Sequence, residues 1–86
     1  MPTGSNSDNR EIHRVLGQHI RELRSKRGYS QERFADHCHL HRTYMGAIER
    51  GERNLTLQTL LNVAKGLGMT LSQLLSGLEK KAANHT

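Results

Sequence analysis

The chain has 86 residues, of which 34% are apolar, and its 13 lysines and arginines against 8 acidic residues give a net charge of +5. A chain of this size forms one small domain with a modest core, which argues against a deep enzyme-type active site. The basic balance favours a nucleic acid or another anionic surface as the partner. The single cysteine, Cys38, excludes an internal disulfide and is typical of a cytoplasmic protein. The sequence shows neither the apolar stretch of a secretory signal nor an apolar run of membrane-spanning length.

The first predicted element is a helix over residues 9–27. Residues 1–8 are mostly small and polar and are predicted to be a disordered tail. Asp8 and Glu11 have the spacing of a capping box, with Asp8 as the N-cap. Apolar residues then recur at helical spacing until Gly28, which is expected to end the helix. These apolar residues are Leu16, Ile20 and Leu23.

Two short helices joined by a tight turn are predicted within residues 30–51. Ser30 is expected to cap the first helix, Leu40 to fill the turn, and the second helix to run from about 41 to 49 until Gly51 ends it. Such a pair is a helix-turn-helix, whose second helix has the right width for a DNA major groove. The residues expected to face inward are Phe34, Ala35, Cys38, Tyr44, Met45 and Ile48.

Two further helices complete the predicted all-α, five-helix domain, which spans residues 9–78. Thr56 is expected to cap the fourth helix, and Thr70 with Gln73 forms a capping box that opens the fifth. The polar residues 79–86 are predicted to be a frayed tail. One face of the fourth helix is expected to carry Leu57, Leu60, Leu61, Ala64 and Leu67, and the fifth helix carries Leu71, Leu74, Leu75 and Leu78.

Several short motifs occur in register across residues 16–76, and together they resemble the lambda-repressor-like family of regulators, also called the XRE family. The motifs are Ser30-Gln31-Glu32, Phe34-Ala35, Tyr44, Ile48-Glu49-Arg50-Gly51, Asn54, Leu57, Thr59-Leu60-Leu61, Ala64-Lys65, Leu67-Gly68 and Leu71-Ser72-Gln73-Leu74-Leu75. The chain departs from the family at His39, where Gly is frequent, and at Leu55, where Pro is frequent. The resemblance implies a lambda-repressor-like fold with a helix-turn-helix that binds double-stranded DNA.

The resemblance also implies roles for individual residues. A structural ion pair is expected between Arg24 and Glu49. The family's base-reading surface falls on His41, Arg42, Thr43, Gly46 and Ala47. Among these, Arg42 can donate two hydrogen bonds to guanine, and Gly46 and Ala47 offer only close approach or contact with a thymine methyl. Phosphate contacts are expected from Gln31, Tyr44, Arg50, Arg53 and Asn54, which flank the second helix of the motif.

The predicted function is a sequence-specific transcriptional regulator that binds a palindromic operator as a homodimer. Leu71, Leu74, Leu75 and Leu78 are more leucines than one small core needs, so they are candidates for the dimer interface, although all four can instead belong to the core. Two alternatives stay open: an antitoxin that represses its own operon, and a protein–protein adaptor that kept the fold. The resemblance extends to small stand-alone regulators such as restriction–modification controller proteins.

Metal binding and catalysis are not expected. His37, Cys38, His39 and His41 are close in sequence, but side chains two apart on a helix diverge by about 200°, and zinc needs four converging ligands. The carboxylates show no paired arrangement, and an inward-facing thiol makes a poor nucleophile. No glycine-rich phosphate loop occurs. We therefore expect no enzyme activity, no cofactor and no small-molecule ligand.

Overall fold

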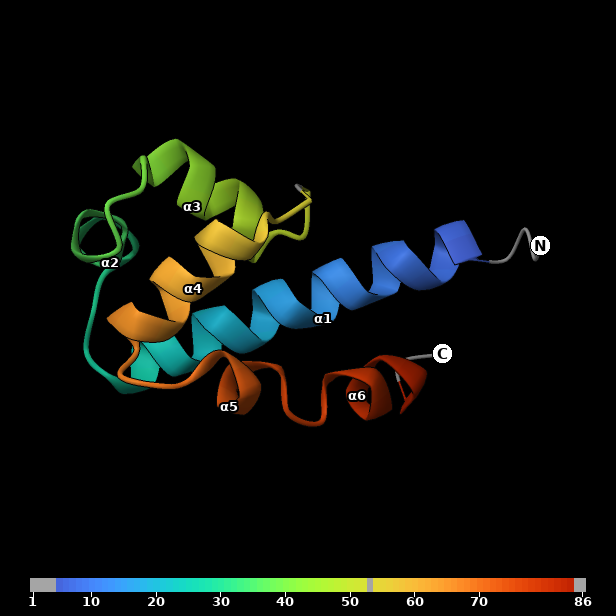
Figure 1. Cartoon of the computed structure of the whole chain (residues 1–86). Coiled ribbons are helices and arrows are strands. Elements are labelled where there is room, and N and C mark those ends of the chain that lie inside the picture. The colour runs from blue at the N-terminus through green and yellow to red at the C-terminus, as the bar shows by residue number, and fades with distance from the viewer. Residues whose placement is uncertain (1–4, 53, 85–86) are drawn as a thin grey trace.

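The computed structural model describes residues 5–52 and 54–84. Helices are the only regular secondary structure among these residues, and turns and short loops connect them (Figure 1). The helices are α1 (Ser5–Lys26), α2 (Gln31–His37), α3 (Arg42–Glu49), α4 (Leu57–Gly66), α5 (Leu71–Leu75) and α6 (Leu78–Asn84). The prediction of an all-α fold is confirmed for the described residues. None of the described helices has the length and apolar character that crossing a membrane requires.

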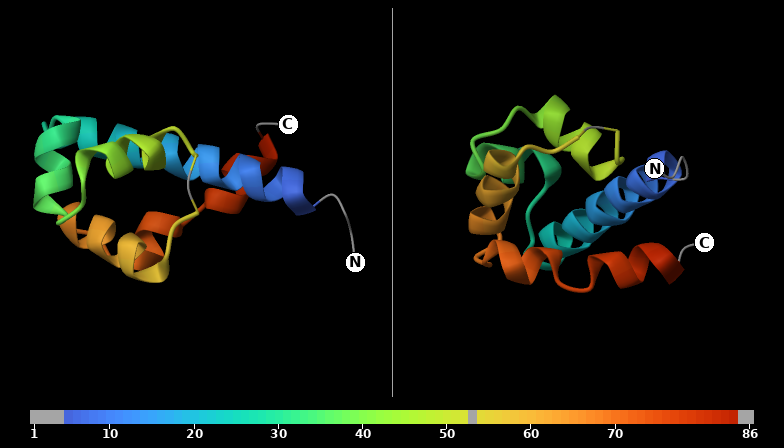
Figure 2. Two further views of the ribbon diagram at one scale, coloured as in Figure 1. Left: turned by 90° about the horizontal axis from the view of Figure 1, so that it is seen from above. Right: turned by 45° about the vertical axis from the view of Figure 1, so that its right-hand side comes forward.

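Helix α1 is the longest element, with 22 residues, and the other helices pack around it. Helices α3 and α6 both contact α1 and lie on different sides of it (Figures 1 and 2). The helix begins at Ser5 rather than at residue 9, so Asp8 is a helical residue and not the predicted N-cap. Residues 5–8 contain neither proline nor glycine, so nothing in them interrupts a helix. The capping-box spacing was therefore a poor guide to where α1 starts. The rest of the predicted disordered tail, residues 1–4, lies outside the described residues.

Gly17 allows α1 and α3 to cross closely. A Cβ atom at Gly17 would overlap the carbonyl oxygen of Ile48 and lie 2.8 Å from that of Glu49. Both are backbone atoms at the end of α3, so a side chain at position 17 would force the two helices apart. The sequence pattern did not reveal this requirement, because glycine inside a helix usually only weakens it.

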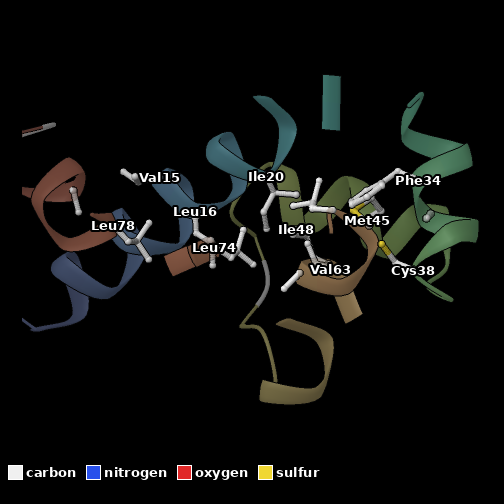
Figure 3. Close-up of a cluster of buried hydrophobic side chains, with 14 residues drawn as sticks. Val15, Leu16, Ile20, Phe34, Cys38, Met45, Ile48, Val63, Leu74 and Leu78 are labelled. Carbon is white, nitrogen blue, oxygen red and sulfur yellow. The ribbon is translucent and has the colours of Figure 1, made fainter. Parts of the chain in front are cut away.

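The core lies between α1 and the shorter helices, which contribute one buried face each (Figure 3). Phe34, Ile20 and Met45 are its largest fully buried side chains. In α4 the buried face carries Thr59, Val63 and Ala64, whereas Leu57 is 63% exposed. The predicted inward face of α4 was therefore wrong at Leu57. Leu57, Leu60, Leu61 and Ala64 share one face of the helix, but α4 is turned so that Thr59 and Val63, beside that face, are buried and Leu57 is not. Hydrophobicity alone therefore did not identify the buried face.

Gly77 divides the predicted fifth helix into two. It has φ of +76°, a left-handed conformation that ends one helix and that only glycine adopts readily. The chain then forms α6, where the sequence predicted a frayed tail from residue 79. Leu78 and Ala82 lie one turn apart in α6 and are 9% and 7% exposed, so they extend the core along α1. The amine of Lys81 also lies 3.2 Å from Nδ1 of His19 in α1.

The four leucines proposed for dimerisation divide between core and surface. Leu74 is fully buried and Leu78 is 9% exposed, so neither is available to a partner in this conformation. Leu71 and Leu75 are partly buried and pack against the core from its edge. The prediction of a dimer interface is therefore wrong for Leu74 and Leu78, because α5 and α6 turn these side chains toward α1.

Candidate nucleic-acid interface

Local hydrogen bonds shape the turn between α2 and α3. The hydroxyl of Ser30 accepts a hydrogen bond from the amide of Arg33 at 3.1 Å and so caps α2. After α2, His39 adopts φ of +61°, the left-handed conformation that a family glycine would provide, and the amide of Leu40 donates to the carbonyl of Ala35 at 2.8 Å. The departure at His39 therefore leaves the turn intact. As a result α3 leaves the turn in a new direction and packs across α2 (Figure 1).

Helix α3 is buried from Met45 to Glu49 and exposed at its start and just after its end. Met45 and Ile48 are 0% and 2% exposed and anchor the helix in the core. Arg42 and Thr43, at its start, are exposed on the outer face, and Arg50 follows its last residue and is also exposed. The outer face therefore begins and ends with a guanidinium group, which suits contact with bases or phosphates.

Gly46 and Ala47 do not fit the base-contacting role that the resemblance implied. Ala47 is only 7% exposed, so its methyl group cannot reach a thymine in this conformation. Gly46 is buried beneath two side chains: a Cβ atom there would lie 3.2 Å from Nη1 of Arg50 and 3.4 Å from Oε1 of Gln31. The side chains of Arg50 and Gln31 pack over Gly46 and cover it. The sequence placed it on the outer face but did not show what covers it.

Glu49 is the centre of a buried polar network that joins α1, α2 and α3. Its carboxylate accepts hydrogen bonds from Nε of Arg24 at 2.7 Å and from Nη2 of Arg24 at 3.1 Å. Nε2 of Gln31 donates to the same carboxylate at 3.0 Å. The structure thus joins Arg24 and Glu49 as the resemblance implied. It also ties Gln31, expected to bind phosphate, to the end of α3.

The two arginines of the outer face each have a carboxylate neighbour. Nη1 of Arg42 lies 3.4 Å from Oε2 of Glu32, and Arg50 donates to both carboxylate oxygens of Glu52 at 2.9 and 3.1 Å. The hydrogen bond and the charge of Glu52 raise the pKa of Arg50 above its ordinary value. These carboxylates were missed as partners. Arg50 and Glu52 are only two positions apart, so the sequence could have indicated this pair. Glu32 and Arg42 are ten positions apart, and only the folded turn brings them together.

The outer ends of α2 and α3 surround an open depression of about 350 Å³. Glu32 borders this depression and also a second, adjoining one that His39, His41 and Asp36 line. The two depressions together form an open polar surface rather than an enclosed pocket. Its first depression is lined by Gln31, Glu32, Arg42, Thr43, Gly46 and Arg50.

The remaining predicted contact residues among those described do not line the first depression. His41 is exposed at the N-cap of α3, where its side chain makes no capping hydrogen bond. Asn54 is exposed in the loop before α4, and Tyr44 is partly buried against the core. Arg53, predicted to contact phosphate, lies outside the described residues.

The histidine and cysteine side chains around the turn have different surroundings. Cys38 is 1% exposed, and burial raises the pKa of its thiol to about 11. The ring of His37 stacks on Tyr29 with centroids 5.2 Å apart. His39 and His41 are exposed. Among the described residues, no group of three or more His, Cys, Asp or Glu side chains is placed to hold a metal ion.

Comparison with known proteins gives matches across most of the chain. The model of a helix-turn-helix domain family matches residues 15–76. Control protein C.SmaI of Serratia marcescens is 42% identical over 66 residues, which cover 77% of this chain and 79% of that protein. Control protein C.MunI of a Mycoplasma species is 46% identical over 67 residues, covering 77% and 90%. The structure of the restriction-modification controller protein C.AhdI of Aeromonas hydrophila has 41% identity and a TM-score of 0.69, covering 71% of this chain and 92% of that one.

Proposed function

This chain belongs to the helix-turn-helix family of lambda-repressor-like (XRE) regulators, and on that premise we propose that it is a sequence-specific DNA-binding transcriptional regulator. The observation that carries the proposal is the outer face of α3, where exposed Arg42 and Thr43 stand at the start of a helix whose other face is anchored in the core. An α-helix fits the major groove of B-DNA, where each base pair presents its own pattern of donors and acceptors.

In this proposal Arg42 reads sequence and other residues hold the DNA backbone. Its guanidinium can donate two hydrogen bonds to O6 and N7 of a guanine, and Thr43 beside it can contact a second base. Arg50 rests on Gly46 at the far end of the same face, a position suited to phosphate. Asn54, Tyr44 and His41 are proposed to add contacts at the edges, and Arg53 keeps its sequence-based assignment as a phosphate contact.

We propose that the regulator acts in the cytoplasm as a homodimer on a pseudo-palindromic operator. Two recognition helices would then lie about 34 Å apart, one turn of DNA. Because Leu74 and Leu78 belong to the core, the proposed dimer surface is revised to Leu57, which is 63% exposed, with the partly buried Leu71 and Leu75. Leu57→Asp, which adds a charge to this surface, is expected to lower dimer formation in sedimentation experiments.

The test begins with selection of a preferred duplex from random sequences at controlled salt. Arg42→Ala is then expected to cost roughly 1–3 kcal/mol on the selected duplex and to relax the preference at one base pair. Arg53→Ala is expected to weaken binding to selected and scrambled duplexes alike and to reduce the salt slope by about one. Equal losses on both duplexes for Arg42→Ala would show that Arg42 holds phosphate and that other residues, or DNA shape, provide specificity.

A further inference from the structure

Glu32 bridges the two helices of the motif to reach the residue proposed to read bases. It belongs to the first turn of α2, and Arg42, ten positions later, opens α3. Their side chains are 64% and 69% exposed, and the charged atoms lie 3.4 Å apart. The pair is therefore accessible and can open without disturbing the core.

Glu32 also lies among the groove-facing groups rather than on a remote solvated face. It lines both depressions of the outer surface, one shared with Thr43 and Arg50 and the other with His41. A carboxylate at this point would come close to the negative DNA backbone when α3 enters the groove. Like charges at short range repel, so Glu32 must affect how the protein binds DNA.

The hydrogen-bonding capacity of arginine suggests what that effect is. A guanidinium has five N–H groups in a rigid fork, and a guanine uses two of them. On a guanine, Arg42 can therefore keep its ion pair with Glu32, which limits the directions that the fork can take. Adenine and thymine each offer only one acceptor in the major groove, so on other bases Arg42 gains less while the charge of Glu32 still faces the phosphates.

We propose that Glu32 is a specificity-determining residue that penalises binding of Arg42 to sequences without the correct guanine. This inference rests on the proposed function, since it concerns the same DNA-binding face. In the free protein Glu32 cancels the charge of Arg42, which weakens the sequence-independent attraction to DNA. At the operator, hydrogen bonds from Arg42 to the guanine offset the loss of affinity that Glu32 causes. The loss therefore falls mainly on binding to random DNA.

The test compares Glu32→Gln with the wild type on the selected duplex and on a scrambled duplex of equal composition. Glu32→Gln is expected to tighten binding to scrambled DNA roughly three- to fivefold, the size of one exposed ion pair. The salt slope on scrambled DNA is expected to steepen by up to about one, because one more cation then meets phosphate. Affinity for the selected duplex is expected to change less, so the ratio of the two affinities falls.

Asp36→Asn is the matched control. Asp36 is exposed one turn further along α2 and lines the same depression as His41, and it takes part in none of the ion pairs among the described residues. The Asp36→Asn substitution removes the same charge as Glu32→Gln but leaves the ion pair of Arg42 in place. The ratio of its affinities for the selected and scrambled duplexes is therefore expected to stay at the wild-type value. Equal shifts in the two variants would overturn the proposal and leave only a general charge effect.

A double variant separates this inference from the proposed function. In an Arg42→Ala background, Glu32→Gln is expected to have no larger effect than Asp36→Asn, because the pair no longer exists. An undiminished effect in that background would overturn the role assigned to Glu32. A wild-type protein that prefers no duplex at all would overturn the proposed function itself. A wild-type preference with an unchanged ratio in Glu32→Gln would overturn only this inference.

Discussion

Glu49→Gln is expected to destabilise the domain by about 2–4 kcal/mol, slightly less than the roughly 3–5 kcal/mol typical of breaking a fully buried ion pair. The carboxylate is 3% exposed and accepts three hydrogen bonds, two from Arg24 and one from Gln31. Glutamine has a similar shape but carries no charge, so Arg24 would remain as a nearly buried cation with a weakened partner. Arg24 is 11% exposed, and the limited access of water to it places the expected cost below the maximum.

The measurement is urea denaturation followed by far-UV circular dichroism at fixed protein concentration, with thermal unfolding as a second readout. A domain of this size loses roughly 4–8 °C in Tm per kcal/mol, so the expected fall is about 8–32 °C. Glu52→Gln is the control, because Glu52 is 56% exposed in its pair with Arg50 and should leave the midpoint almost unchanged.

A double variant identifies the cause of the loss. Arg24→Met combined with Glu49→Met removes both charges and fills similar volume, so it is expected to recover much of the stability that Glu49→Gln loses. The reasoning would be refuted if Glu49→Gln left the urea midpoint and Tm at wild-type values. It would also be refuted if the effects of the two Met substitutions simply added, since a buried ion pair requires coupling between them.

Gly17→Ala is expected to destabilise the domain by about 1–3 kcal/mol, as overpacking does, although alanine is the better helix former. Gln18→Ala, at an exposed position of the same helix, is the control and should leave the stability unchanged or raise it. A Gly17→Ala protein as stable as the wild type would contradict the close crossing of α1 and α3. The thiol of Cys38 is expected to resist alkylation at pH 8 in the folded protein and to react readily in urea, because it is 1% exposed and its pKa is raised to about 11; equal rates would exclude its burial. Burial and the charge of Lys81 lower the pKa of His19 below 6.5 in the folded protein, so the contribution of neutral His19 to stability should be complete above pH 6.5 and be lost as the pH falls from 6.5 through the lowered folded-state pKa. Unfolding free energies between pH 5 and 8 should therefore decline less in His19→Gln than in the wild type, and identical profiles would contradict this.

Local interactions explain which parts of the fold were predictable. The caps at Ser30 and Thr56 and the capping box of Thr70 with Gln73 are all present. Each depends on residues three positions apart, so the sequence contains all that such a cap requires. The burial of Phe34 and Ala35 in α2 and of Met45 and Ile48 in α3 was predictable for a similar reason, because these residues lie at helical spacing within short segments. The resemblance to a family added the pair of Arg24 and Glu49, which no local pattern reveals.

Tertiary packing decided the remainder. Leucines around α4 and α5 suit either a core or an interface, and only the position of α1 makes Leu74 buried while Leu57 stays exposed. Ala47 and Gly46 have no distinctive pattern, yet the side chains and helices around them remove both from the groove surface. The approach of Glu32 to Arg42 depends on the angle between α2 and α3. The sequence by itself therefore determined which segments are helical and which family they belong to. The relative placement of the helices, set by contacts between residues distant in the chain, determined which side chains are available to DNA and to a second copy of the protein.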